Sequence, residues 1–106
     1  MKNGRPIDLV LNLKGEYFDQ IKAGIKPFEY RLQGKHWDRW LLVDPLNPAG
    51  SAYRTFRNII IRKGYPKAGT PDRELIRPWN GAVRMNITHE HFGDGPVAVH
   101  AIRVNP

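Results

Sequence analysis

The pattern of hydrophobic and polar positions along the chain predicts five strands and two short helices. In residues 7–13, apolar side chains occupy every second position, which is typical of a strand with one buried face. Apolar residues at helical spacing predict helices over residues 15–23 and 36–42. Further apolar runs predict the remaining strands at residues 27–32, 57–63, 82–90 and 97–104.

The segment from Gly24 to Arg31 joins the first predicted helix to a strand. Gly24 can take the left-handed conformation that ends a helix. Pro27 biases the residue before it toward an extended conformation, so the chain leaves the turn as a strand. On that strand Glu29 and Arg31 share one face, while apolar side chains share the other. We therefore expect the apolar face to enter a core and the opposite face to present an ion pair.

The rest of the pattern completes the predicted architecture. Residues 58–61 form a continuous apolar run, which predicts a central strand buried on both faces. Trp37 and Trp40 recur at helical spacing, which favours side chains that cover the core over the alternative of platforms for base stacking. Residues 67–81 contain two prolines and predict a long irregular loop. Five strands and two helices in this order predict one α+β domain over residues 1–106, a small and mostly antiparallel β-barrel.

Composition restricts the classes of function. The chain has 17 Lys and Arg residues against 10 Asp and Glu, a net charge of +7 that favours a polyanionic partner. With no cysteine, disulfides, a thiol nucleophile and a thiolate metal site are excluded. No apolar run reaches the length of a membrane span, so we expect a cytoplasmic protein with no membrane partner.

The string Gly24-Ile25-Lys26-Pro27-Phe28-Glu29-Tyr30-Arg31 resembles the G-x-K-x-x-E-x-R signature of the ASCH domain family at all four fixed positions. ASCH domains resemble the barrel of pseudouridine synthase and archaeosine transglycosylase (PUA), so the resemblance implies a PUA-like fold. Three further segments are similar to recurring segments of small bacterial and phage ASCH proteins: residues 62–66, 79–81 and 88–93.

The resemblance implies that the chain binds RNA or a nucleotide in a basic cleft lined by Lys26, Glu29 and Arg31. Some ASCH proteins are hydrolases, so the first alternative is a ribonuclease or a nucleoside amidohydrolase with these three residues in catalysis. In the amidohydrolase branch a threonine, the proposed nucleophile, typically stands at the position of Glu29. This chain departs from that pattern, so the resemblance does not by itself imply the same covalent mechanism. A second alternative is a non-catalytic module that binds another protein.

The chemistry of the three signature residues allows either activity. A lysine beside a carboxylate can hold a phosphate or stabilise a developing oxyanion. Glu29 could act as a general base on water. If Arg31 holds Glu29 in a tight pair, Glu29 is a positioning group rather than a base.

Basic and aromatic residues are interleaved in the second half of the chain: Arg62, Lys63, Tyr65, Lys67, Arg77, Trp79 and Arg84. This mixture suits single-stranded nucleic acid, in which rings stack on bases and cations meet the backbone. The alternative is a solvated basic rim with the aromatic rings folded inward. The predicted nucleic-acid-binding residues are Lys26, Arg31, Arg62, Lys63, Tyr65, Trp79, Arg84, His89 and His91.

His89 and His91 are two residues apart and share a face if their strand persists. Two histidines could begin a metal site, but zinc takes three or four ligands and no third ligand lies nearby in the sequence. We therefore expect no metal and no cofactor. Hydrogen bonding beside a nucleotide and a purely structural role remain open for this pair, as does the oligomeric state of the chain.

Overall fold

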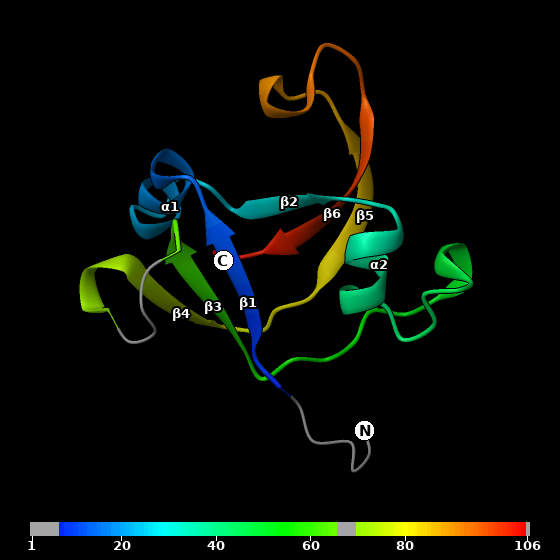
Figure 1. Ribbon diagram of the computed structural model, residues 1–106, viewed down its shortest axis with the longest axis horizontal. Helices are drawn as coiled ribbons and strands as arrows, with labels where there is room; N and C mark the ends of the chain where they lie inside the picture. Colours follow the sequence, from blue (N-terminus) through cyan, green and yellow to red (C-terminus); the bar gives the residue numbers. More distant parts are fainter. Residues whose placement is uncertain (1–6, 66–69, 106) are drawn as a thin grey trace. The chain divides into compact units, whose positions relative to one another are not determined.

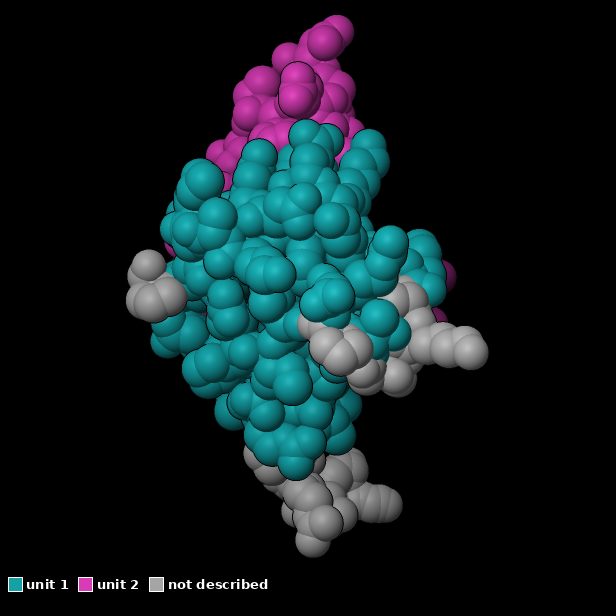
Figure 2. Space-filling model, turned by 90° about the vertical axis from the view of Figure 1, so that its left-hand side faces the viewer, with its two compact units in different colours: residues 1–27, 55–80, 103–106 teal, residues 28–54, 81–102 magenta. Residues whose placement is uncertain are grey.

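The computed structural model describes residues 7–65 and 70–105, which form two helices and six strands (Figure 1). The predicted α+β class is thereby confirmed. The chain divides into two compact units, coloured teal and magenta in Figure 2. Unit 1 comprises residues 1–27, 55–80 and 103–106, and unit 2 comprises residues 28–54 and 81–102.

Unit 1 is built on a three-stranded sheet in the order β1-β3-β4. The central strand β3 (Asn58–Lys63) runs parallel to β1 (Leu9–Leu13) and antiparallel to β4 (Glu74–Pro78). Figure 1 shows the β1 and β3 arrows side by side, pointing the same way. One face of this sheet carries the core side chains of the unit. The buried ones from β1 and β3 are Leu9, Leu11, Leu13, Ile59 and Ile61.

The opposite face of this sheet is open. Val10, Ile60 and Ile76 lie in one row across the three strands. Val10 is 38% exposed and Ile76 is 59% exposed, while Ile60 between them is half-buried. The prediction that β3 is buried on both faces is therefore wrong on this side, because its neighbouring strands leave their side chains in solvent.

Helix α1 (Gly15–Lys22) packs against β3 and buries Phe18 and Ile21. It ends in a two-bond Schellman turn. Gly24, with a φ of 77°, donates its backbone N–H to the Ile21 carbonyl at 3.0 Å, and the next amide donates to the Gln20 carbonyl at 2.9 Å. The predicted helix stop at Gly24 is thus confirmed.

Unit 2 is built on a second three-stranded sheet, in the order β2-β6-β5. These strands are β2 (Phe28–Leu32), β6 (Val97–Arg103) and β5 (Ala82–Ile87), and β5 is antiparallel to β6. Helix α2 (Lys35–Leu41) belongs to the same unit. The buried apolar side chains of unit 2 are Leu41, Leu42, Val99, Ala101 and Ile102.

Two predictions about the strands are wrong. Instead of the five predicted strands, the described residues form six strands, which lie in two sheets. No closed barrel is found among these described strands, and a PUA-like barrel stays a prediction. The loop predicted over residues 67–81 contains a 3-10 turn (Pro71–Arg73) and strand β4, while residues 67–69 lie outside the described part. Strand β4 forms because β3 supplies its pairing partner, and Pro78 stands at its end, where a missing N–H is tolerated.

Two predictions about burial are also wrong. Trp40 is 50% exposed and does not cover the core; the buried positions of α2 are held by Asp38 and Leu41. On β2 the ion-pair face is the more buried one, since Glu29 is 8% exposed and Leu32 is 45% exposed. In both elements a polar side chain with a partner takes the inner position and an apolar one turns outward.

None of the helices in the described part of the chain is long and apolar enough to cross a membrane.

Candidate functional site

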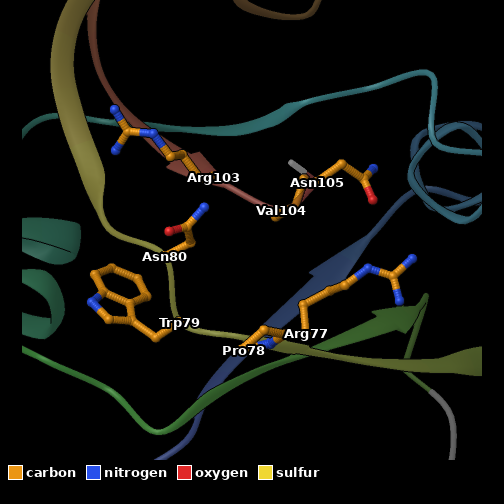
Figure 3. A pocket seen from close by; sticks show the side chains of 7 residues that line it. All are labelled: Arg77, Pro78, Trp79, Asn80, Arg103, Val104 and Asn105. Atoms are coloured by element: carbon orange, nitrogen blue, oxygen red, sulfur yellow. The ribbon is translucent and has the colours of Figure 1, made fainter.

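Unit 1 contains a pocket with a volume of about 380 Å³ (Figure 3). Ligand sites for small molecules typically begin at about 300 Å³, so the pocket can take a molecule of that class. Its walls come from the end of β4 with the residues after it, and from the C-terminal segment. The lining residues are Arg77, Pro78, Trp79, Asn80, Arg103, Val104 and Asn105.

Arg77 occupies a core-facing position of the sheet. It lies directly opposite Ile59 in the β3–β4 pair, and Ile59 in turn lies beside Leu9 of β1. Residues directly opposite each other in neighbouring strands present their side chains on the same face. Ile59 is fully buried and Leu9 is 5% exposed, so Arg77 continues a row of core side chains. The sequence thus places a charge where the row would ordinarily take an apolar residue.

Two other arginines of unit 1 form ion pairs with carboxylates, whereas Arg77 does not pair with a described carboxylate. Arg57 pairs with Asp8 at 2.8 Å, and Arg62 pairs with Glu74 at 2.9 Å. Within the described part of the chain, the Arg77 guanidinium makes no hydrogen bond or ion pair. A half-buried cation without a carboxylate partner, opening into a pocket, is available to an acceptor on a ligand.

The C-terminal wall of the pocket is fastened to the segment that carries Lys26. The Val104 backbone N–H donates to the Pro27 carbonyl at 2.9 Å. The side-chain amide Nδ2 of Asn105 donates to the Ile21 carbonyl at 2.9 Å and to the Lys26 carbonyl at 2.8 Å. The backbone after α1 therefore holds Asn105 in place, and the position of this wall depends on the helix stop at Gly24.

Trp79 supplies the aromatic part of the lining. Its ring is half-buried and packs edge-on against Phe56 at a centroid distance of 4.9 Å. Its backbone N–H donates to the Arg57 carbonyl at 3.3 Å, which fixes the chain just beyond β4. Figure 3 shows the Asn80 amide on the same side of the pocket as Arg103, while the Arg77 side chain extends toward Asn105.

The structure brings Glu29 and Arg31 together as an ion pair. Lys26, the third signature residue, belongs to unit 1. An Arg31 nitrogen lies 3.0 Å from a Glu29 carboxylate oxygen, and the guanidinium carbon lies 4.9 Å from the Trp37 ring centroid. Lys26 is half-buried, with its Nζ 5.5 Å from the Tyr17 ring centroid. Glu29 and Arg31 thus form the tight pair for which we expect Glu29 to be a positioning group rather than a base.

The other predicted cations make contacts of their own. Arg62 pairs with Glu74, and Lys63 lies 3.2 Å from Asp19. In unit 2, Arg84 donates to the backbone carbonyls of Pro48 and Ser51 at 2.6 and 2.7 Å. Their predicted role in RNA binding stays a prediction; each also has a structural role. The predicted contact Tyr65 is 90% exposed, and Lys67 of the interleaved set lies outside the described residues.

His89 and His91 do not continue a strand. Strand β5 ends at Ile87, and a 3-10 turn over Glu90–Phe92 follows. The His89 Nδ1 accepts the His91 backbone N–H at 3.1 Å, and both rings pack edge-on against Phe92. Among the described residues no group of three or more His, Cys, Asp or Glu is placed to hold a metal ion.

A buried chain of hydrogen bonds in unit 2 links three residues that the sequence did not single out. His100 is 1% exposed; its Nε2 lies 2.7 Å from Asp38 Oδ1, and its Nδ1 lies 2.7 Å from the Tyr53 hydroxyl. A carboxylate only accepts, so Nε2 donates to Asp38 and a neutral imidazole then accepts from Tyr53. Burial raises the pKa of the Tyr53 phenol above its usual value of 10.0. This chain fastens α2 and the segment around Tyr53 to β6.

Sequence patterns identified only part of the pocket. Trp79 is in the predicted binding set, and Arg77 is in the interleaved basic and aromatic set, but Asn80, Arg103 and Asn105 are in neither. Their grouping depends on the register of β4 against β3 and on the bonds from Asn105 to the turn after α1. Neither the register nor these long-range bonds has a signal in local periodicity.

No family model matches the chain, and no curated protein or solved structure matches it either.

Proposed function

We propose that this chain binds RNA or a nucleotide through the pocket of unit 1. The observation that carries the proposal is Arg77, a guanidinium at a core-facing position that opens into the pocket. Removing a charge from water costs free energy, and an apolar side chain would continue the row of Leu9 and Ile59 without that cost. Positions where a residue contradicts its local pattern are often functional sites.

The lining chemistry supports a nucleic-acid ligand. Guanidinium groups such as those of Arg77 and Arg103 donate hydrogen bonds to phosphate oxygens and to base edges. The Trp79 ring adds an aromatic surface of the kind on which unpaired bases stack. A net charge of +7 adds long-range attraction toward a polyanion.

The ASCH-like signature fits this proposal through its backbone. The Lys26 carbonyl accepts a hydrogen bond from Asn105, so the signature turn supports one wall of the pocket. Lys26 itself supplies a cation in the same unit. The RNA contacts predicted for Arg31 in unit 2 remain part of the proposal as a separate contribution.

The proposal is tested with a fluorescently labelled single-stranded RNA whose anisotropy reports binding. The key variant is Arg77→Gln, and the matched control is Arg73→Gln, which removes the same charge from an exposed residue of the same unit. Loss of a charge-assisted hydrogen bond should weaken binding by about tenfold or more in Arg77→Gln. Arg73→Gln should change affinity by much less.

Salt provides the second part of the test. Binding by cations to phosphates weakens steeply as salt rises, because each neutralised phosphate releases counterions. Equal losses of affinity in Arg77→Gln and Arg73→Gln would mean diffuse attraction without a site. Absence of RNA binding at low salt would overturn the proposed function itself.

A further inference from the structure

The side-chain amide of Asn105 is fixed in one orientation. An amide nitrogen carries two hydrogens, and Asn105 uses both of them, on the Ile21 carbonyl at 2.9 Å and the Lys26 carbonyl at 2.8 Å. These two bonds also decide which end of the amide is nitrogen, because only nitrogen can donate to a carbonyl. The atom left to meet a ligand is Oδ1, which only accepts.

The same pocket also contains a donor. Asn105 lines the pocket, and Figure 3 shows its oxygen turned toward the side where the Arg77 guanidinium lies, with its nitrogen turned away. Arg77 offers N–H donors and no acceptor. The pocket therefore presents a rigid acceptor, Asn105 Oδ1, together with a positively charged donor, the Arg77 guanidinium.

A phosphodiester of the RNA backbone does not match this pair of groups. Its oxygens would be attracted by Arg77, but it carries no hydrogen-bond donor for Oδ1, whose lone pairs would repel those oxygens. The ligand group that fits both must carry a hydrogen-bond donor as well as an acceptor. The Watson–Crick edge of an unpaired nucleobase has this property, and proteins read single-stranded RNA on such edges.

We infer that the pocket reads the edge of an unpaired nucleobase, with Asn105 Oδ1 accepting from a base N–H and Arg77 donating to the neighbouring base acceptor. Trp79 supplies part of the apolar lining for the base, and the phosphates of the strand lie outside the pocket. Asn105 is then a specificity-determining residue. This inference rests on the proposed function, since it names the part of the nucleotide that the same site binds.

The inference is tested with nucleosides, which carry a base and no phosphate. Uridine and guanosine are titrated into the full chain, and the amide NMR signals of Trp79, Asn80, Arg103 and Asn105 are followed. The matched ligands are 3-methyluridine and 1-methylguanosine, in which a methyl group replaces the ring N–H donor. This comparison changes only the ligand and needs no protein variant, so its result does not depend on whether a variant folds.

We expect saturable shifts of these signals with at least one of the two parent nucleosides. Its methylated counterpart should bind about tenfold more weakly or worse, since it leaves Oδ1 without a donor. Dimethyl phosphate, a phosphodiester without a hydrogen-bond donor, should leave the signals unchanged at equal ionic strength. Equal binding of the methylated nucleoside, shifts with dimethyl phosphate as large as with nucleoside, or no shift with either parent nucleoside would each overturn the inference.

Failure of the inference is distinguishable from failure of the proposed function. If nucleosides do not shift these signals but labelled RNA still binds and loses affinity in Arg77→Gln, the pocket contacts the RNA backbone and the proposed function stands. If labelled RNA does not bind at low salt, the proposed function fails whatever the nucleosides do.

Discussion

Arg77 lies directly opposite Ile59 in the antiparallel pair of β3 and β4, so a guanidinium stands at the end of a row of core side chains. The sheet of unit 1 tolerates this charge because the position opens into a pocket rather than into packed apolar groups. A residue held at such a position for binding should limit the stability of the unit. Stability and ligand affinity are therefore expected to change in opposite directions when Arg77 is replaced by an apolar residue.

In unit 2, the Tyr53 hydroxyl should contribute to stability through His100. Tyr53→Phe leaves the buried Nδ1 of His100 without its 2.7 Å partner, which should lower the free energy of unfolding by about 1–2 kcal/mol. Urea unfolding measures this change. The control is Tyr65→Phe, which removes a hydroxyl from a residue that is 90% exposed and should have little effect. Equal effects of the two variants would contradict the structural role of the buried chain.

The same hydroxyl predicts a dependence on alkaline pH. Burial raises the pKa of Tyr53 in the folded protein above 10.0, so folding favours the neutral phenol. The stability that this preference provides is complete below pH 10.0 and is lost as the pH rises through the folded pKa. The advantage of the wild type over Tyr53→Phe in urea unfolding should therefore shrink above pH 10.0. If the stability difference between the wild type and Tyr53→Phe stays constant with pH, the raised pKa of Tyr53 would be contradicted.

The exposed pair of Asp8 and Arg57 predicts a dependence on acidic pH. The hydrogen bond from Arg57 holds the pKa of the Asp8 carboxyl below its usual value of 3.8, so folding favours the ionised form. The contribution of the pair is complete above pH 3.8 and is lost as the pH falls through the folded pKa. The urea midpoints of wild type and Asp8→Asn should differ at neutral pH and converge in acid. A difference that grows in acid would show that the pKa of Asp8 is not lowered by folding.

Substitutions of Glu29, which pairs with Arg31 on β2, should distinguish RNA binding from hydrolysis. In Glu29→Gln the amide oxygen can still accept a hydrogen bond from Arg31, so RNA affinity should be retained. Glu29→Ala removes the acceptor from a mostly buried pair and should cost about 1–3 kcal/mol of stability. Hydrolysis of RNA or of acylated nucleosides is assayed in parallel. A loss of turnover of about 10²–10⁴-fold in Glu29→Gln would make Glu29 a general base and support the enzymatic alternative.

Local sequence rules predicted the elements whose signals are local. Gly24 ends α1 as expected, because its left-handed conformation is a property of the glycine itself. The faces of β2 have the predicted parity, with Phe28 and Tyr30 stacked at 6.3 Å and Glu29 paired with Arg31. The alternation of side chains along the strand does not show which face is buried, because burial depends on the packing of distant segments.

The residues of the pocket are brought together by contacts between segments far apart in the sequence, which local patterns do not reveal. Strand β4 has a proline and two charged residues within five positions, and only its pairing with β3 identifies it as a strand. Asn105 carries no motif; its importance follows from bonds to residues about eighty positions earlier. His100 lies in an apolar run and reads as an ordinary core position until Asp38 and Tyr53 are placed beside it.

The most direct test is the affinity of Arg77→Leu for single-stranded RNA, measured beside its urea unfolding curve. Leucine continues the apolar row of Leu9 and Ile59, so the variant should be at least as stable as the wild type. Its affinity should fall by about tenfold or more, because the donor in the pocket is gone. Arg73→Leu is the control for the loss of one charge in the same unit. An Arg77→Leu variant that is stable and binds RNA as tightly as Arg73→Leu would contradict the assignment of this pocket as the binding site.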